Sequence, residues 1–161
     1  MAVFLFVSIA ILAFWGFADK TKFRAMFPIL ITAVFLRFLD HYVLIDWFKL
    51  WVMHGEGWRT IWIPMLANLT IWSTAAYFYI QFLPRPYHPK GKHFVLLSLY
   101  TALFVLVMCG YMRALLYFQV LSMRDSWTLW HSALNQYVYF LLIYVIYRWL
   151  TQPVRGGASH V

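Results

Sequence analysis

The side chains with the most chemical potential lie inside segments that are otherwise apolar. Residues 35–48 read FLRFLDHYVLIDWF and place Arg37, Asp40 and His41 at i, i+3 and i+4, on one face of a helix. On insertion scales, a charged side chain at the centre of a bilayer costs at least ~2.5–3.5 kcal/mol. We therefore expect these three side chains to turn toward other polar groups inside a helix bundle.

Polar side chains recur at similar depth in three other apolar segments. Counting ~1.5 Å per residue from the nearer end of each segment places Asn68, Arg113 and Asn135 about 10–12 Å inside it. Asp40 lies ~15 Å inside its own segment on the same count. The pattern predicts one polar layer, in which Asp40 pairs with Arg113 and Arg37 competes for the same carboxylate. The layer comprises Arg37, Asp40, His41, Asn68, Arg113, Asn135 and Gln136.

Two interpretations of this polar layer remain open. Ion pairs and amides can fix the register of helices that packing alone specifies poorly. Alternatively, intramembrane polar groups can line an outward-facing pocket or a proton path.

Motifs for catalysis or cofactor binding are not evident. A b-type haem needs two imidazoles that face each other, and His41 and His131 differ in depth by ~9 Å on the rise-per-residue count. Cys109 has no evident neighbouring base, and the chain carries neither HExxH nor a glycine-rich phosphate loop. We therefore predict no metal and no cofactor, with haem through His41 or His131 as the less favoured alternative. A membrane enzyme or cytochrome is the least favoured of the functions considered.

Composition and hydropathy indicate how these residues are positioned. The 161 residues are 64% hydrophobic and 11% charged, with a mean hydropathy of +0.70, whereas soluble domains carry about 25% charged residues. A membrane-spanning helix needs ~17–25 residues, and continuous apolarity excludes the alternating strands of a barrel. The sequence thus predicts an all-α integral membrane bundle of five transmembrane helices in a single domain, 1–161. The spans are 2–18, 27–50, 60–83, 94–121 and 128–149.

Basic residues alternate between the connections and predict the orientation. Only Arg59 and Arg124 lie in one set of connections, and eight basic residues lie in the other set or at the C-terminal end. By the positive-inside rule, the N-terminus is outside and the C-terminus cytoplasmic, in a multi-pass protein of the cytoplasmic membrane. Because the basic residues form no single patch, nucleic acid is not a predicted partner. The eight are Lys20, Lys22, Arg24, Arg85, Lys90, Lys92, Arg148 and Arg155.

Tryptophans gather at the predicted outer ends of the spans. Indole rings favour the membrane–water boundary, so they predict an outer aromatic rim that anchors the protein or, alternatively, binds a partner. The six are Trp47, Trp51, Trp58, Trp62, Trp127 and Trp130.

The order of landmarks along nearly the whole chain resembles a known family. A basic loop precedes an aspartate late in the second helix, in FADKTKFRAMFPILITAVFLRFLDHYVL, and the last helix opens with SWTLWHSALNQYVYF. This resembles small five-helix integral membrane proteins of endospore-forming bacteria, for which no activity is established. The resemblance implies a helical fold and a bacterial membrane. Those proteins often carry a glutamate in the fourth helix, where this chain has Arg113.

Two functions follow as expectations. The first is a non-enzymatic structural or accessory component that lies in the lipid bilayer and assembles with itself or with other membrane proteins. The second is a small transporter or binding protein, whose polar pocket in the outer half holds an ion, a proton or a lipid headgroup.

Overall fold

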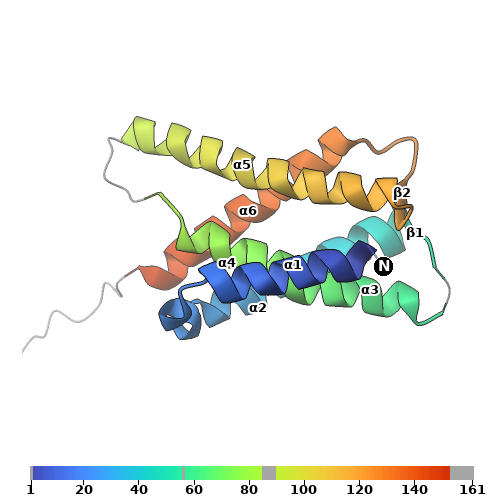
Figure 1. Cartoon of the computed structure of the whole chain (residues 1–161). Coiled ribbons are helices and arrows are strands. Elements are labelled where there is room, and N and C mark those ends of the chain that lie inside the picture. Colours follow the sequence, from blue (N-terminus) through green and yellow to red (C-terminus); the bar gives the residue numbers. More distant parts are fainter. Residues whose placement is uncertain (1, 56, 85–89, 153–161) are drawn as a thin grey trace, which may run out of the picture.

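The computed structural model describes residues 2–55, 57–84 and 90–152, and each of the five apolar segments is helical in it (Figure 1). The segments are α1 (Ala2–Phe17), α2 (Phe23–His41) with η2 (Tyr42–Trp47), α3 (Arg59–Ala67) through η3 (Asn68–Trp72) into α4 (Ser73–Gln81), α5 (Lys90–Tyr117) and α6 (Leu129–Thr151). The prediction of an all-α fold is confirmed at this level.

A short antiparallel ribbon joins two of the connections, a feature that the sequence analysis did not predict. Strand β1 (Trp51–Met53) pairs with β2 (Leu121–Met123), with Val52 opposite Ser122. The backbone bond from Arg124 N to Leu50 O, at 3.0 Å, extends the ribbon. The ribbon ties the α2–α3 connection to the α5–α6 connection, and we call this side of the bundle the ribbon end (Figure 1).

The other side of the bundle, which we call the basic end, holds the α1–α2 connection, the start of α5 and the end of α6 (Figure 1). Here Asp19 caps the short 3-10 turn η1 (Lys20–Lys22) and forms an ion pair with Lys22 at 2.9 Å. Hydrogen bonds from Thr21 and then Lys22 lower the pKa of the Asp19 carboxyl below its ordinary value of 3.8. Of the predicted cytoplasmic residues, Lys20, Lys22, Arg24, Lys90, Lys92 and Arg148 belong to this end; Arg85 and Arg155 lie outside the described residues.

Small and aromatic side chains form the centre of the bundle. Helix α2 contacts α4 and α6, α1 lies along α3, η3 and α4, and α5 packs chiefly on α6. Ala33 and Ala76 are fully buried and allow close helix approach, while Tyr79 and Phe140 fill the remaining space. The hydroxyl of Tyr79 is satisfied by Thr101 Oγ1 at 2.9 Å.

The outward faces of the helices are strongly apolar. Segments Lys20–Trp47 and Lys92–Tyr117 are each long and apolar enough to cross a membrane, and Val3–Phe17 is a shorter apolar helix. Only 17% and 28% of the residues in the apolar windows of the two long segments are buried inside the protein. Large side chains such as Leu12, Leu106 and Trp149 are more than 70% exposed. The apolar surface of these helices is thus directed away from the protein.

Candidate functional site

A single ion pair dominates the polar layer near the ribbon end. Arg37 and Asp40 lie one turn apart on α2, so their side chains share a face, and the guanidinium donates to the carboxylate Oδ2. The two side chains are only 11% and 18% exposed. The Arg37 guanidinium also stacks 3.5 Å from the centre of the Trp72 ring, a cation–π contact that stabilises a poorly solvated charge.

The second carboxylate oxygen of Asp40 is held by another helix. Asn135, on α6, donates from Nδ2 to Asp40 Oδ1 at 2.8 Å. Both Asp40 oxygens therefore have a donor, and the bond fixes the register of α6 against α2.

The predicted pairing of Asp40 with Arg113 is wrong. Arg37 is the partner, because it lies on the same helix face and needs no approach of two helices. Arg113 is exposed on α5, one turn before that helix ends at Tyr117. A long side chain at this position can extend past the end of the helix toward polar surroundings, so it does not need a partner inside the bundle.

Two π-helical segments shape the surroundings of the ion pair. In η2, Phe48 N donates to Val43 O, five residues back, at 3.0 Å. In η3, Asn68 and Trp72 stand at the two ends of the segment, and the Ser73 hydroxyl donates to Asn68 O at 3.1 Å. Such widened turns occur frequently at functional sites, where they redirect side chains without ending the helix.

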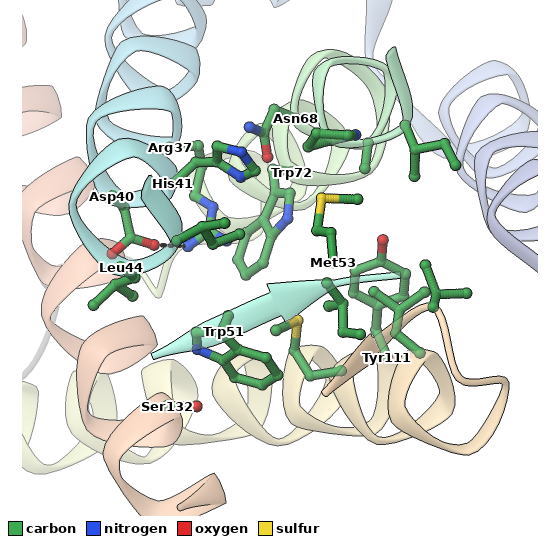
Figure 2. A pocket seen from close by; sticks show the side chains of 18 of the residues that line it. Arg37, Asp40, His41, Leu44, Trp51, Met53, Asn68, Trp72, Tyr111 and Ser132 are labelled. Carbon is green, nitrogen blue, oxygen red and sulfur yellow. Dashed lines mark hydrogen bonds and ion pairs between the residues drawn. The ribbon is translucent and has the colours of Figure 1, made fainter. Parts of the chain in front are cut away.

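The two π-helical segments border the same cavity. Its volume is about 80 Å³, and its walls come from α1, α2, η2, the ribbon, α3, η3, α5 and α6. Figure 2 shows Asn68 and Trp72 near Arg37 and His41, with β1 and Tyr111 beneath them. Six of the seven residues predicted for the polar layer line this cavity, namely Arg37, Asp40, His41, Asn68, Asn135 and Gln136.

The cavity holds an excess of hydrogen-bond donors. Asn68 is 4% exposed, and its Nδ2 has no hydrogen-bond partner within the part of the chain that the structure describes. Arg37 Nε is also buried and has no hydrogen-bond partner among the described residues. Each Asp40 oxygen accepts one bond, from Arg37 Nη1 or from Asn135, and neither oxygen is bonded to Asn68 Nδ2 or Arg37 Nε. One water needs ~10–15 Å³ of cavity volume, so the cavity has room for several waters or a small ligand group.

Several residues of the site were not identified from the sequence. Tyr111 and Ser132 line the cavity, but nothing in their sequence neighbourhood separates them from other half-polar residues of a span. The prediction that Trp51 belongs to the exposed outer rim is wrong. Trp51 lies on β1, is 4% exposed and forms part of the cavity wall. The pairing of β1 with β2 directs this indole inward, and assigning helical spans from the sequence does not predict that pairing.

The other rim tryptophans lie at the ribbon end with different exposure. Trp47, Trp58, Trp62 and Trp130 are all more than half exposed. Trp127 is half-buried, and its Nε1 donates to the Ser132 hydroxyl at 2.7 Å. This hydrogen bond stabilises the start of α6.

The two candidate haem ligands have different surroundings. His41 lines the cavity, whereas His131 is exposed and its Nδ1 accepts from Thr128 N at 3.2 Å in the capping box of α6. Within residues 2–55, 57–84 and 90–152, no group of three or more His, Cys, Asp or Glu side chains is arranged to hold a metal ion.

A second hollow adjoins the cavity. It has a volume of about 340 Å³ and lies between η2, the ribbon and α3. His41, Ile45, Met53 and Pro64 line both spaces, so the two share a wall.

Comparison of the chain with protein-family models, curated proteins and solved structures finds no match.

Proposed function

We propose that this protein is a five-helix, multi-pass membrane protein that binds a small ligand in the polar cavity near its ribbon end. The membrane part of the proposal is supported by the outward apolar faces. A core helix of a soluble protein is mostly buried, but the two long apolar segments bury only 17% and 28% of their apolar windows. Exposed apolar surface on this scale marks contact with lipid or with other proteins.

The charge distribution supports a defined orientation. Six basic positions in the described residues belong to the basic end, against Lys49, Arg59, Arg113 and Arg124 near the ribbon end. Under the positive-inside rule the basic end faces the cytoplasm, which puts the cavity in the outer half of the bundle. The resemblance to five-helix membrane proteins of endospore-forming bacteria remains a prediction that agrees with this arrangement.

The single observation that carries the binding function is the pair of donors without acceptors. A buried polar group that lacks a partner costs ~1–3 kcal/mol, and Asn68 Nδ2 and Arg37 Nε both meet this description. A ligand that satisfies them must supply acceptor oxygens, as a carbonyl or a carboxylate does. The remaining wall includes Leu44, Ile63 and Met112, which suits an apolar body attached to that group.

The adjoining hollow gives this ligand a route. His41 lines both the cavity and the hollow, so we propose that rotation of its imidazole side chain connects the two spaces. We therefore expect a membrane-soluble ligand to arrive from the side of the bundle.

The test compares Asn68→Leu with Thr70→Val. Both residues lie on η3, but Thr70 lines a different hollow, so it is a matched control. We expect wild-type protein, purified in mild detergent, to retain a small molecule in native mass spectrometry. Asn68→Leu should lose it while keeping its melting temperature, and Thr70→Val should keep it. A wild-type protein that carries nothing, or an Asn68→Leu variant that keeps the molecule, contradicts the proposal.

A second candidate is an accessory component that assembles with itself or with other membrane proteins. An apolar hollow of about 510 Å³ between α1, α2, η3 and α4 favours it, because side chains of a neighbouring helix fit such a surface. Trp15 and Phe27 lie on its rim and are about half exposed or more. The oligomeric state in nanodiscs tests this candidate: a monomer that remains a monomer at every protein-to-lipid ratio contradicts self-assembly.

A further inference from the structure

The basic end of the bundle contains a hollow of its own, which shares no residue with the polar cavity. Its volume is about 290 Å³, and it lies where α2 begins, α4 ends, α5 begins and α6 ends. Three of its lining residues are basic or imidazole side chains, namely Lys22, His93 and Arg148. Among the described residues that line it, none is acidic.

The basic side chains that line this hollow have N–H groups available for a ligand. Arg148 forms no ion pair within the described part of the chain, and its side chain is exposed at the end of α6. Lys22 binds Asp19 at 2.9 Å, but its side chain stays 56% exposed and an ammonium has three protons to donate. Asp19 itself does not line the hollow.

Not every polar residue of the wall is free for a ligand. Gln81 accepts from Asp19 N at 2.8 Å and donates to Phe17 O at 2.9 Å, so it serves to clamp α4 onto the α1–α2 connection. Tyr144 and Tyr147, on α6, also line the hollow.

An independent observation comes from His93. Its Nδ1 is buried, yet it has no hydrogen-bond partner among the described residues. His93 also lies in the first turn of the 28-residue helix α5, where unpaired backbone N–H groups and the helix dipole favour an anion. His93, at the start of α5, therefore brings a buried ring nitrogen to a hollow that two basic side chains also line.

We propose that this hollow binds a phosphate group. A phosphate combines negative charge with several acceptor oxygens, which matches charge-assisted donation from Arg148 and Lys22 together with a bond to His93. Basic pockets between helices on the cytoplasmic side of a membrane recognise anionic headgroups in the same way. The phosphate belongs either to a phospholipid or to a soluble phosphate compound, and the experiment separates the two sources. The inference does not depend on the ligand of the polar cavity.

The experiment measures binding of phosphatidylglycerol and of inorganic phosphate to the whole protein in mild detergent, by native mass spectrometry. The test variants are Arg148→Gln, Lys22→Gln and His93→Gln. The controls are Lys20→Gln and Arg24→Gln, which remove the same charge from the same end of the bundle but do not line the hollow. From the usual contribution of one basic side chain near an anionic headgroup, we expect Arg148→Gln and Lys22→Gln each to weaken binding about fivefold. His93→Gln should weaken it too, and the controls should bind as the wild type does.

The outcomes separate the sources and the alternatives. Binding of phosphatidylglycerol that free phosphate does not displace assigns the site to a lipid headgroup; binding of both assigns it to phosphate in general. If neither binds, or if the controls weaken binding as much as the test variants, the proposal is overturned. Asn68→Leu should leave phosphate binding unchanged, so a failure of the polar-cavity proposal is recognisable separately. Equal melting temperatures of all variants show that loss of binding does not reflect unfolding.

Discussion

Arg37 and Asp40 show how a charged pair persists among apolar helices. The carboxylate receives Arg37 on one oxygen and the Asn135 amide on the other, while the guanidinium stacks on Trp72. With each charge contacted on several sides, the desolvation cost of the pair is largely offset. Among the residues that the structure describes, Arg37 Nε has no hydrogen-bond partner.

Single substitutions should therefore cost more than the double substitution. We expect Asp40→Asn and Arg37→Gln each to destabilise the protein by ~3–5 kcal/mol, because each leaves one buried charge without its counter-charge. The double variant removes both charges and should regain part of that loss. The measurement is the free energy of unfolding in detergent for the three variants.

Arg113→Gln is the matched control for these variants. Arg113 is exposed on α5, so its replacement should change the free energy of unfolding by no more than ~0.5 kcal/mol. A loss as large as that of Arg37→Gln would show that Arg113, and not Arg37, neutralises Asp40.

At this scale the sequence predicts which residues gather but not how they pair. Depth counting places Asn68, Asn135 and Asp40 at one level, since the rise of a helix is fixed, and the structure puts all three around one cavity. The choice between Arg37 and Arg113 depends on the rotation of α5 about its axis. An α5 that is apolar around most of its circumference leaves that rotation unspecified.

The helices approach closely where small side chains allow it. Ala76 on α4 is fully buried, and α4 contacts both α2 and α6. Bulkier residues at such positions would force the packed helices apart.

Ala76→Leu should accordingly destabilise the bundle by ~1–3 kcal/mol through overpacking. Ala102→Leu is its control, because Ala102 is exposed on α5 and the same substitution meets no neighbouring helix there. Thermal unfolding in detergent, followed by circular dichroism, compares the two variants. Equal melting temperatures for both would contradict the observed α4 interface.

Helices were predicted well from the sequence, and the ribbon was not predicted. Continuous apolar runs make a helix the only element that satisfies its own backbone, which is why 60–83 and 128–149 correspond to helical segments. Strands β1 and β2 have only three residues each and lie 70 positions apart in the chain. Their pairing depends on how the helices bring the two connections together, which no local pattern encodes.

For the molecule as a whole, the ribbon end and the basic end differ in charge and in the hollows they contain. The donor-rich cavity lies at one, and the hollow with Lys22, His93 and Arg148 at the other. If the proposed five spans are correct, the two hollows belong to opposite leaflets.

Labelling of single cysteines tests that arrangement. In a Cys109→Ser background, Ser126→Cys adds a thiol to the exposed connection at the ribbon end, and Thr151→Cys adds one to the exposed end of α6. We expect a membrane-impermeant maleimide to modify the first variant in intact cells and the second only after permeabilisation. Modification of both from the same side would rule out the proposed topology.

The π-helical segments also govern how the chain tolerates a change in length. A π turn holds one residue more than an α turn, and each residue of an α-helix accounts for ~100° of rotation. Deletion of one residue within η3 can thus be absorbed as regular α-helix, with α3 and α4 left in their places. Descendants that lost that residue would retain the architecture while presenting other side chains in place of the Asn68 amide. A one-residue gap at this point in an alignment of related sequences would accordingly indicate a change in the ligand specificity of the cavity, with the fold retained.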